Sequence, residues 1–373
     1  MFDLAEFNIK FNSNVDNLPI YVPGKAISTV ARELGMKESD LIKLASNENS
    51  FGPSKKTIKA AKDALKQMHI YPDGSYFDLK KEIAKKYGLT MENVSLGNGS
   101  NELIELIGHV LLSEGDEVVV SEYCFAIYPI VAKLFKATPV VVPSKNYGHN
   151  LLAMANAITT KTKLIFIANP NNPTGTIASS EEVEEFLKKA PSNVLVVMDE
   201  AYSEYVDNPT NLFGKIADNF MPNLCILRTF SKMYALAGLR VGYALANPNF
   251  IAALEKAREP FNVNVIAQKA ALAALLDLPH VKKVKLENKK GIKFLQENFK
   301  LMNLQFVPSS ANFVLVNVKD GASVFNNLQK EGVIVRPVGG YGLPQWIRVT
   351  SGTMKENKKF LSALKKVLSK MKY

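Results

Sequence analysis

The sequence predicts an α/β fold: a mostly parallel sheet sandwiched by helices, with a smaller α+β unit beside it. The first observation is a series of short β-branched runs ended by polar or turn residues, at 116–123, 138–144, 163–170, 193–202 and 223–231. Continuous apolar runs of this length are typical of strands buried on both faces. The second is the helical pattern between strands, as in 179–190, where Ser180 is placed to cap a helix with early acids and late lysines. Such alternation favours a parallel sheet covered by helices.

The third observation is a change of pattern after about residue 245. Helical segments interrupted at Pro260 and Pro279 are followed by shorter β-like runs at 312–318 and 332–338 and by a Lys-rich helix over about 354–371. We expect these segments to form the smaller unit. The predicted division is an N-terminal arm with part of the small domain (1–45), a large domain (46–260) and a small C-terminal domain (261–373).

Composition narrows the class of protein. The chain has 373 residues, of which 47% are hydrophobic and 22% charged, enough for a substantial core. It has no run of eighteen apolar residues, so no membrane span is expected, and its acidic start "MFDLAEFNIK" lacks the features of a secretory signal. Cys124 and Cys225 are too few for a disulfide framework and match no metal spacing. We therefore expect a reduced, cytoplasmic protein without a metal.

The net charge of +11 raises the question of nucleic-acid binding. The lysines are scattered in pairs and mixed with glutamates, without interleaved aromatic residues. That pattern is typical of solvated helix faces. We expect no nucleic-acid partner, and a positive field that attracts small anionic substrates.

Polar residues at the strand ends carry the chemistry, because ligands of open α/β sheets bind beyond the carboxyl ends of the strands. Each has a plain structural alternative. "SLGNGSNELIEL" (95–106) leads through two glycines into a helix, which suits an anion or an ordinary tight turn. "ANPNNPTG" (168–175) is a ligand-binding loop or a simple turn, and Asp199 is a buried acid or a helix cap. Lys232, taken alone, would more often be a surface residue.

Together, in this order, these features suit pyridoxal phosphate. The phosphate of this cofactor needs N–H donors and a cation. Its pyridine nitrogen needs a carboxylate, and its aldehyde needs a lysine amine. The chain resembles the fold-type I, class-II aminotransferases, and more narrowly the histidinol-phosphate aminotransferases, over nearly its whole length. The resemblance is carried, in order, by "KLASNENSFGPS", "YPDGSYFDLK", "GNGSNELIEL", "NPNNPTG", "DEAY", "TFSKMYALAGLRVGY" and "IRVTSGT".

The resemblance implies a catalytic set of three residues. Lys232 would hold the cofactor covalently and move the substrate proton, Asp199 would pair with the protonated pyridine nitrogen, and Tyr202 would hydrogen-bond the cofactor O3′, as would Asn172. The lysine must be neutral near pH 7, and we expect Arg240 and partial desolvation to lower its pKa.

The resemblance also implies the remaining cofactor contacts. The phosphate would be bound by backbone N–H groups of Gly99, Ser100 and Asn101, by the hydroxyls of Thr229 and Ser231, and by Arg240. Phe125 would stack on the pyridine ring, unless it is simply a core residue. Tyr71 matches a tyrosine that reaches the neighbouring subunit's cofactor phosphate, which implies a homodimer with shared active sites.

Substrate recognition is assigned in the same way. Arg348 matches the arginine that receives the α-carboxylate of the amino donor. Arg336 matches a second basic residue, which faces a substrate phosphate. Tyr21 matches a tyrosine that closes over the substrate. Two departures from the family pattern, Ser50 in "NENS" and the stretch "SEYCF" before Phe125, bear on the pocket wall.

The resulting hypothesis is a homodimeric aminotransferase. It would convert L-histidinol phosphate and 2-oxoglutarate to imidazole-acetol phosphate and L-glutamate, in histidine biosynthesis. The alternatives are an aromatic amino acid aminotransferase, a phosphothreonine decarboxylase and a non-catalytic regulator that binds the cofactor.

Overall fold

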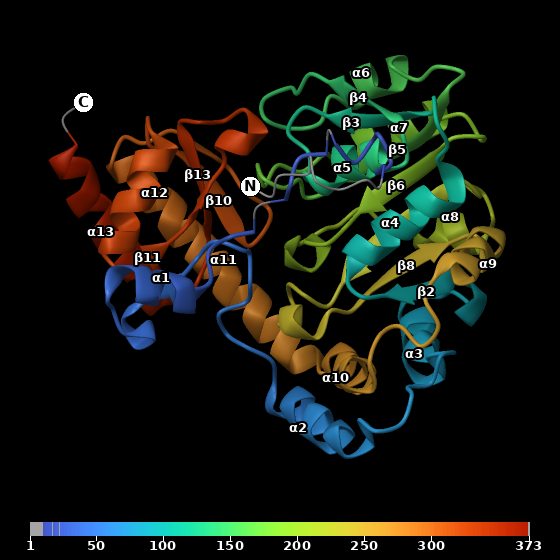
Figure 1. Ribbon diagram of the computed structural model, residues 1–373, viewed down its shortest axis with the longest axis horizontal. Coiled ribbons are helices and arrows are strands. Elements are labelled where there is room, and N and C mark those ends of the chain that lie inside the picture. Colours follow the sequence, from blue (N-terminus) through green and yellow to red (C-terminus); the bar gives the residue numbers. More distant parts are fainter. Residues whose placement is uncertain (1–9, 17, 22, 372–373) are drawn as a thin grey trace.

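The molecule consists of two units side by side, one built on a large sheet and one on a smaller sheet (Figure 1). The computed structural model describes residues 10–371 except 17 and 22. The long helix α11 (Leu278–Leu301) runs from the base of the large unit to the small one (Figure 1). Among the described residues, no helix is both long enough and apolar enough to cross a membrane.

The large sheet has seven strands in the order β2-β8-β7-β6-β5-β3-β4. Neighbouring strands are parallel except at β8, which is antiparallel to both β2 and β7. The mostly parallel α/β sheet is therefore confirmed. The strands are β2 (Val94–Gly97), β3 (Glu117–Ser121), β4 (Thr138–Val142), β5 (Thr162–Ala168), β6 (Leu195–Asp199), β7 (Leu224–Thr229) and β8 (Gly242–Ala246).

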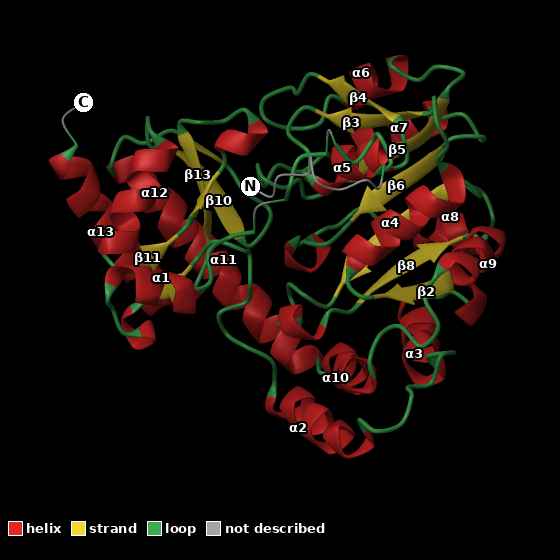
Figure 2. Ribbon diagram, viewed as in Figure 1, coloured by secondary structure: helices red, strands yellow, loops and turns green. Residues whose placement is uncertain are grey.

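Helices cover both faces of this sheet (Figure 2). Alternate residues of one strand enter different cores: Ile165 and Ile167 pack on one side, Leu164 and Phe166 on the other. One face is covered by α3 (Phe77–Tyr87), α6 (Leu151–Asn156), α7 (Ser180–Lys189), α8 (Phe213–Ala217) and α10 (Val265–Leu276), the last packed against α2 (Lys55–Ala64). The other is covered by α4 (Ser100–Leu111), α5 (Ile127–Leu134) and α9 (Pro248–Ala257). Burial on both faces explains the continuous apolar runs of the sequence.

The small unit is built on a four-stranded antiparallel sheet, β12-β13-β10-β9. A short parallel pair, β1 with β11, joins the segment after α1 to this unit. The strands are β1 (Ile42–Lys43), β9 (Phe306–Val307), β10 (Phe313–Asn317), β11 (Val333–Ile334), β12 (Arg336–Pro337) and β13 (Trp346–Thr350). The helices, besides α11, are α1 (Ile27–Leu34), α12 (Gly321–Lys330) and α13 (Met354–Lys370). The division at residues 45 and 260 stays a prediction, although α10 shares the core of the large sheet.

Two local expectations differ from the structure. Helix α7 is capped by Ser179, not Ser180, because Ser179 accepts the amide of Glu182 in a capping box. The expected break near Pro279 is present between α10 and α11, and Pro279 stands in the first turn of α11, where its missing N–H costs nothing. The run at 332–338 is two short strands that pair with different partners, β1 and β13.

A close backbone approach near the sheet edge yields a prediction. A Cβ on Gly242 of β8 would lie 2.5 Å from the Ser100 amide nitrogen and 2.9 Å from the Arg228 carbonyl oxygen. Gly242→Ala should therefore lower the free energy of unfolding by about 1–3 kcal/mol, the typical cost of overpacking. Urea unfolding measures it. The control is Gly214→Ala, where a Cβ meets nothing within 4 Å. Equal stability of the two variants would contradict the packing argument.

Candidate active site

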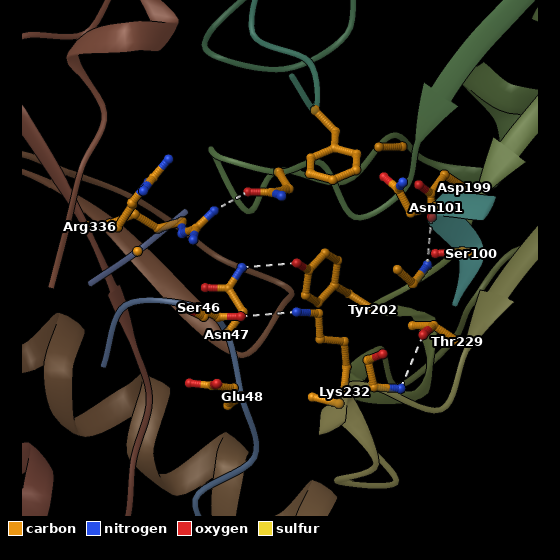
Figure 3. A pocket seen from close by; sticks show the side chains of 18 of the residues that line it. Ser46, Asn47, Glu48, Ser100, Asn101, Asp199, Tyr202, Thr229, Lys232 and Arg336 are labelled. Atoms are coloured by element: carbon orange, nitrogen blue, oxygen red, sulfur yellow. Dashed lines mark hydrogen bonds between the residues drawn. The ribbon is translucent and has the colours of Figure 1, made fainter. Parts of the chain in front are cut away.

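A cavity of about 280 Å³ lies where the carboxyl ends of β5, β6 and β7 face the small unit (Figure 3). Both units line it. Of the predicted site residues, those that line it are Tyr21, Ser100, Asn101, Phe125, Asn172, Asp199, Tyr202, Thr229, Ser231, Lys232, Arg240, Arg336 and Arg348. Residues from eight separate segments of sequence are thus brought together in one place.

Lys232 follows β7 and extends into the cavity (Figure 3). Its Nζ donates a hydrogen bond to the carbonyl oxygen of Ser46, 3.0 Å away. Burial, together with the positive charges of Arg348 and Arg240, lowers the pKa of Lys232 to about 8, while Glu48 opposes this shift. Desolvation and Arg240 both lower this pKa, as expected, and Arg348, which was not expected to do so, contributes more than Arg240. The amine is therefore partly neutral near physiological pH.

Asp199 is the last residue of β6 and is buried beside this amine. Its Oδ2 accepts a hydrogen bond from the Tyr128 hydroxyl at 2.7 Å, and its Oδ1 accepts the Ala201 amide at 3.1 Å. Burial leaves the pKa of Asp199 above its ordinary value, although both hydrogen bonds and the charge of Lys232 lower it. A carboxylate in such a place suits a cationic partner, such as a protonated pyridine nitrogen.

Tyr202 and Asn172 each contact a group on the small-unit side of the cavity. The Tyr202 hydroxyl accepts a hydrogen bond from Asn47 Nδ2 at 2.9 Å. Burial raises the pKa of Tyr202 to about 12, so its hydroxyl stays protonated and can donate. Asn172 Oδ1 accepts a hydrogen bond from the Arg348 guanidinium.

The start of α4 forms an anion cradle with Arg240. Gly99 precedes this helix with φ of 80°, and a Cβ there would overlap the Arg240 guanidinium. Arg240 Nη1 lies 3.3 Å from Ser231 Oγ, and the Ser231 amide donates to Thr229 Oγ1 at 3.0 Å. The Gly99 N–H, which was expected to bind the phosphate, instead donates a hydrogen bond to the Gly97 carbonyl oxygen at 2.7 Å. The backbone N–H groups at the start of α4, the two hydroxyls and the guanidinium are the kinds of donor that a phosphate requires.

Two arginines stand side by side on the small-unit wall. Arg336 of β12 and Arg348 of β13 are register partners in adjacent strands. Arg348 is buried and donates to the Ala45 carbonyl at 2.8 Å. Tyr21, 45% exposed, also lines the cavity, so the wall presents two cations and a phenol.

Tyr71 lies elsewhere. It lines a separate hollow near α3 and α10, is 79% exposed and stacks on Phe261 with ring centroids 4.7 Å apart. Of the predicted site residues, Tyr71 and Gly99 do not line the cavity of their own chain, although Gly99 directly precedes Ser100, which does.

The sequence analysis did not single out Asn47, Tyr128 or Tyr341, which all take part in this region. Asn47 lies within the "NENS" segment that carried the resemblance, and its φ of 55° is one that asparagine tolerates well. Tyr128 stands three residues after Phe125, and Tyr341 in the glycine-rich loop between Arg336 and Arg348. The only hint of their roles in the sequence was that each is an aromatic or amide residue close to a predicted site residue.

These residues fit pyridoxal phosphate. The anion cradle offers donors for the phosphate, and Asp199 offers a carboxylate for the ring nitrogen. Tyr202 and Asn172 could hydrogen-bond the ring hydroxyl, and Lys232 offers an amine for the aldehyde. Phe125 supplies an aromatic face to the cavity. Each of these roles stays a prediction of the residue chemistry.

Comparisons with known proteins point the same way. A family model described as aminotransferase class I and II matches residues 39–364. The chain is 47% identical over 358 residues to a histidinol-phosphate aminotransferase of Akkermansia muciniphila, which covers 96% of this chain and 98% of the relative. It is 47% identical over 352 residues to histidinol-phosphate aminotransferase 1 of Cupriavidus pinatubonensis, covering 93% and 94%.

A solved structure shares the whole fold. The histidinol-phosphate aminotransferase of Sinorhizobium meliloti, in complex with pyridoxal-5′-phosphate, superposes with a TM-score of 0.90 at 28% identity and covers 99% of this chain and all of that one. The fold-type I architecture expected from the sequence is thus confirmed.

The lowered pKa of Lys232 yields a stability prediction. In the unfolded chain the amine titrates near 10.5, so between pH 8 and 10.5 the unfolded state binds more protons and stability rises with pH. Below pH 8 the folded protein bears the full cost of a charged amine. At pH 7 the cofactor-free Lys232→Met variant should therefore be more stable than the parent by about 1–3 kcal/mol, allowing for some solvent access.

Urea unfolding of the cofactor-free proteins at pH 7 and pH 9.5 measures this difference, which should shrink at the higher pH. The control is Lys80→Met, because Lys80 has an acidic partner, Glu255, at 3.4 Å. That variant should be no more stable than the parent. A gap for Lys232→Met that does not change with pH would contradict a buried, depressed amine.

Proposed function

The chain belongs to the class I and II aminotransferases, and on that premise we propose that it transfers the amino group of L-histidinol phosphate to 2-oxoglutarate. The cofactor is pyridoxal 5′-phosphate. The observation that carries the substrate assignment is the pair Arg336 and Arg348, adjacent in register and in the same cavity as Lys232. Two guanidinium groups side by side suit a dianionic phosphate.

When the substrate carbon loses its proton, the electron pair left behind must be delocalised. Bound pyridoxal phosphate supplies an electron-accepting ring for it. Lys232 would hold the group through its aldehyde carbon until the substrate amine displaces it there. The freed Lys232 amine, whose pKa is about 8, would then accept the proton of the substrate carbon that bears the amino group. Asp199 would accept a hydrogen bond from the protonated ring nitrogen, and Tyr202 and Asn172 would orient the ring through its hydroxyl.

Substrate anions are held on the opposite wall. Arg348 is buried and already oriented by Ala45 and Asn172, so it can receive either a carboxylate or a phosphate oxygen. Arg336 adds a second charge for the phosphate. Tyr21, at the cavity mouth, can close over the ligand and exclude water. The same arginines serve glutamate and histidinol phosphate in turn.

We further propose a homodimer in the cytoplasm. An apolar surface formed by Met68, Ile70, Tyr71 and Phe261, each 47–79% exposed, supports an interface with a second copy. Tyr71 would then reach the partner's phosphate cradle. The two free, buried cysteines, Cys124 and Cys225, suit a reducing compartment.

Single-turnover absorbance of the cofactor-loaded protein tests the substrate. L-Histidinol phosphate, L-phenylalanine and O-phospho-L-threonine are added separately, without a keto acid. Histidinol phosphate should convert the cofactor to its amine form fastest. Faster conversion by phenylalanine would indicate an aromatic aminotransferase, and carbon dioxide release from phosphothreonine a decarboxylase.

The variant Arg336→Gln distinguishes binding of a substrate phosphate from binding of a substrate carboxylate. Loss of a charge-assisted contact of about 1.5–3 kcal/mol should lower kcat/KM for histidinol phosphate roughly tenfold to a hundredfold. Phenylalanine, whose carboxylate needs Arg348 alone, should lose much less. Arg32→Gln, on the exposed side of α1, is the control. Equal losses for both substrates would contradict the phosphate role of Arg336.

Shared active sites predict complementation between inactive subunits. Tyr71→Ala and Lys232→Ala should each have low activity as homodimers, because each removes one group from both sites. A hybrid dimer has one site with the Lys232 of one subunit and the Tyr71 of the other. When the two variants are mixed and their subunits re-equilibrated, each hybrid dimer should therefore have up to about half the activity of the parent dimer. No recovery in a preparation shown to contain hybrid dimers would contradict the shared site.

A further inference from the structure

We propose that Tyr128 is a positioning residue for the cofactor, whose hydroxyl keeps the Asp199 carboxylate ionised and whose ring braces Phe125. The proposal rests on the assignment of the cavity to pyridoxal phosphate. Tyr128 lines the cavity, in the first turn of α5 (Ile127–Leu134), and is fully buried.

The hydroxyl contact is direct. Tyr128 donates to Asp199 Oδ2 at 2.7 Å, while the Ala201 amide donates to Oδ1 at 3.1 Å. Each carboxylate oxygen therefore has one protein donor, and each keeps a lone pair for a ligand. The two donors also fix the plane of the carboxylate relative to the cavity.

The ring of Tyr128 is fixed by two aromatic neighbours. It stacks on Phe166 of β5 with centroids 4.4 Å apart and an interplanar angle of 3°. It meets Phe125 edge-on, at 5.6 Å and 84°. Because Phe125 is the aromatic side chain predicted to face the pyridine ring, Tyr128 contacts both the residue that would hold the ring nitrogen and the residue that would hold the ring face.

The need for such a donor follows from burial. Burial raises the pKa of Asp199, and its hydrogen bonds to Tyr128 and Ala201 and the charge of Lys232 lower it. When Lys232 binds the aldehyde as a neutral group, it no longer contributes a positive charge. The buried cation Arg228 is already paired with Glu200, next to Asp199 in the chain, at 2.5 Å, and with Glu204 at 3.0 Å. The Tyr128 and Ala201 donors then remain.

Tyr128 itself stays a donor, because burial and the neighbouring Asp199 charge raise its pKa well above the ordinary value. A carboxylate without this hydrogen bond would more readily take the proton that the ring nitrogen needs. The ring would then be neutral and a weaker electron acceptor. The hydroxyl of Tyr128 thus determines on which atom of the Asp199–nitrogen pair the proton resides.

Tyr128→Phe tests this, since it removes one oxygen and keeps both ring contacts. The control is Tyr243→Phe, which removes an equally buried hydroxyl whose partner, Tyr87, lies at 2.8 Å. The first readout is the dissociation constant of the cofactor-free protein for pyridoxal phosphate and for its 1-deaza analogue, in which carbon replaces the ring nitrogen. The second is the NMR resonance of bound pyridoxal phosphate labelled with ¹⁵N at the ring.

Tyr128→Phe should weaken pyridoxal phosphate binding about tenfold or more, as expected for a lost hydrogen bond to a charged group. Binding of the deaza analogue should be unchanged or tighter, and the nitrogen resonance should move toward that of neutral pyridine. Tyr243→Phe should change neither. In a second variant, Tyr128→3-fluorotyrosine, the shape is kept and the hydroxyl is a stronger donor, so the resonance should not move toward neutral pyridine.

Equal loss of affinity for both ligands, or an unchanged nitrogen resonance in Tyr128→Phe, would overturn the proposal and leave Tyr128 a packing residue. That result would leave the proposed function intact. A parent protein that binds neither ligand would instead overturn the proposed function, and this inference with it.

Discussion

An excess of positive charge in one small cavity is the constraint on which the site depends. Four cations line it, Lys232, Arg240, Arg336 and Arg348, against two acids, Asp199 and Glu48. Charges gathered in a partly desolvated space are unfavourable unless they meet opposite charges. A phosphate at Arg240 and a second anion at Arg336 and Arg348 would offset this excess. Burial is the main cause of the lowered pKa of Lys232, and the positive charges of Arg348 and Arg240 add to it. The same arginines that would attract anions therefore also help to make the Lys232 amine easier to deprotonate.

The parallel strands supply the geometry for this. Asp199 and Lys232 follow neighbouring strands, β6 and β7, and the Asn172 loop follows β5 on the other side of β6. The segment after β1 and the small unit complete the site through three contacts: Ser46 with Lys232, Asn47 with Tyr202, and Arg348 with Asn172. Lys232, Tyr202 and Asn172 are thus each linked to a group on the opposite wall of the cavity. A ligand held by Arg348 would act on the same Asn172 that is predicted to orient the cofactor ring.

Much of this was predictable from the sequence, and the exceptions have physical reasons. Apolar runs located the strands of the large sheet because both faces are buried, and the strand ends located Asp199 and Lys232. Asn47 and Tyr128 were missed because their roles depend on long-range contacts, to Tyr202 and Asp199, that no local pattern reports. The cause of the Lys232 pKa shift was assigned first to Arg240, near in sequence, while Arg348, 116 positions away in the chain, contributes more. The reach of Tyr71 concerns a second copy and stays a prediction.

Lys232 should hold the cofactor covalently within this cavity. Borohydride reduction of the cofactor-loaded protein, followed by peptide mapping by mass spectrometry, tests this, because reduction makes a lysine–cofactor bond permanent. The pyridoxyl group should be found on the peptide containing Lys232, and the Lys232→Ala variant should yield no such modified peptide. A pyridoxyl group on a different lysine in the parent protein, or none on any, would contradict the assignment of the nucleophile and of the cavity built around it.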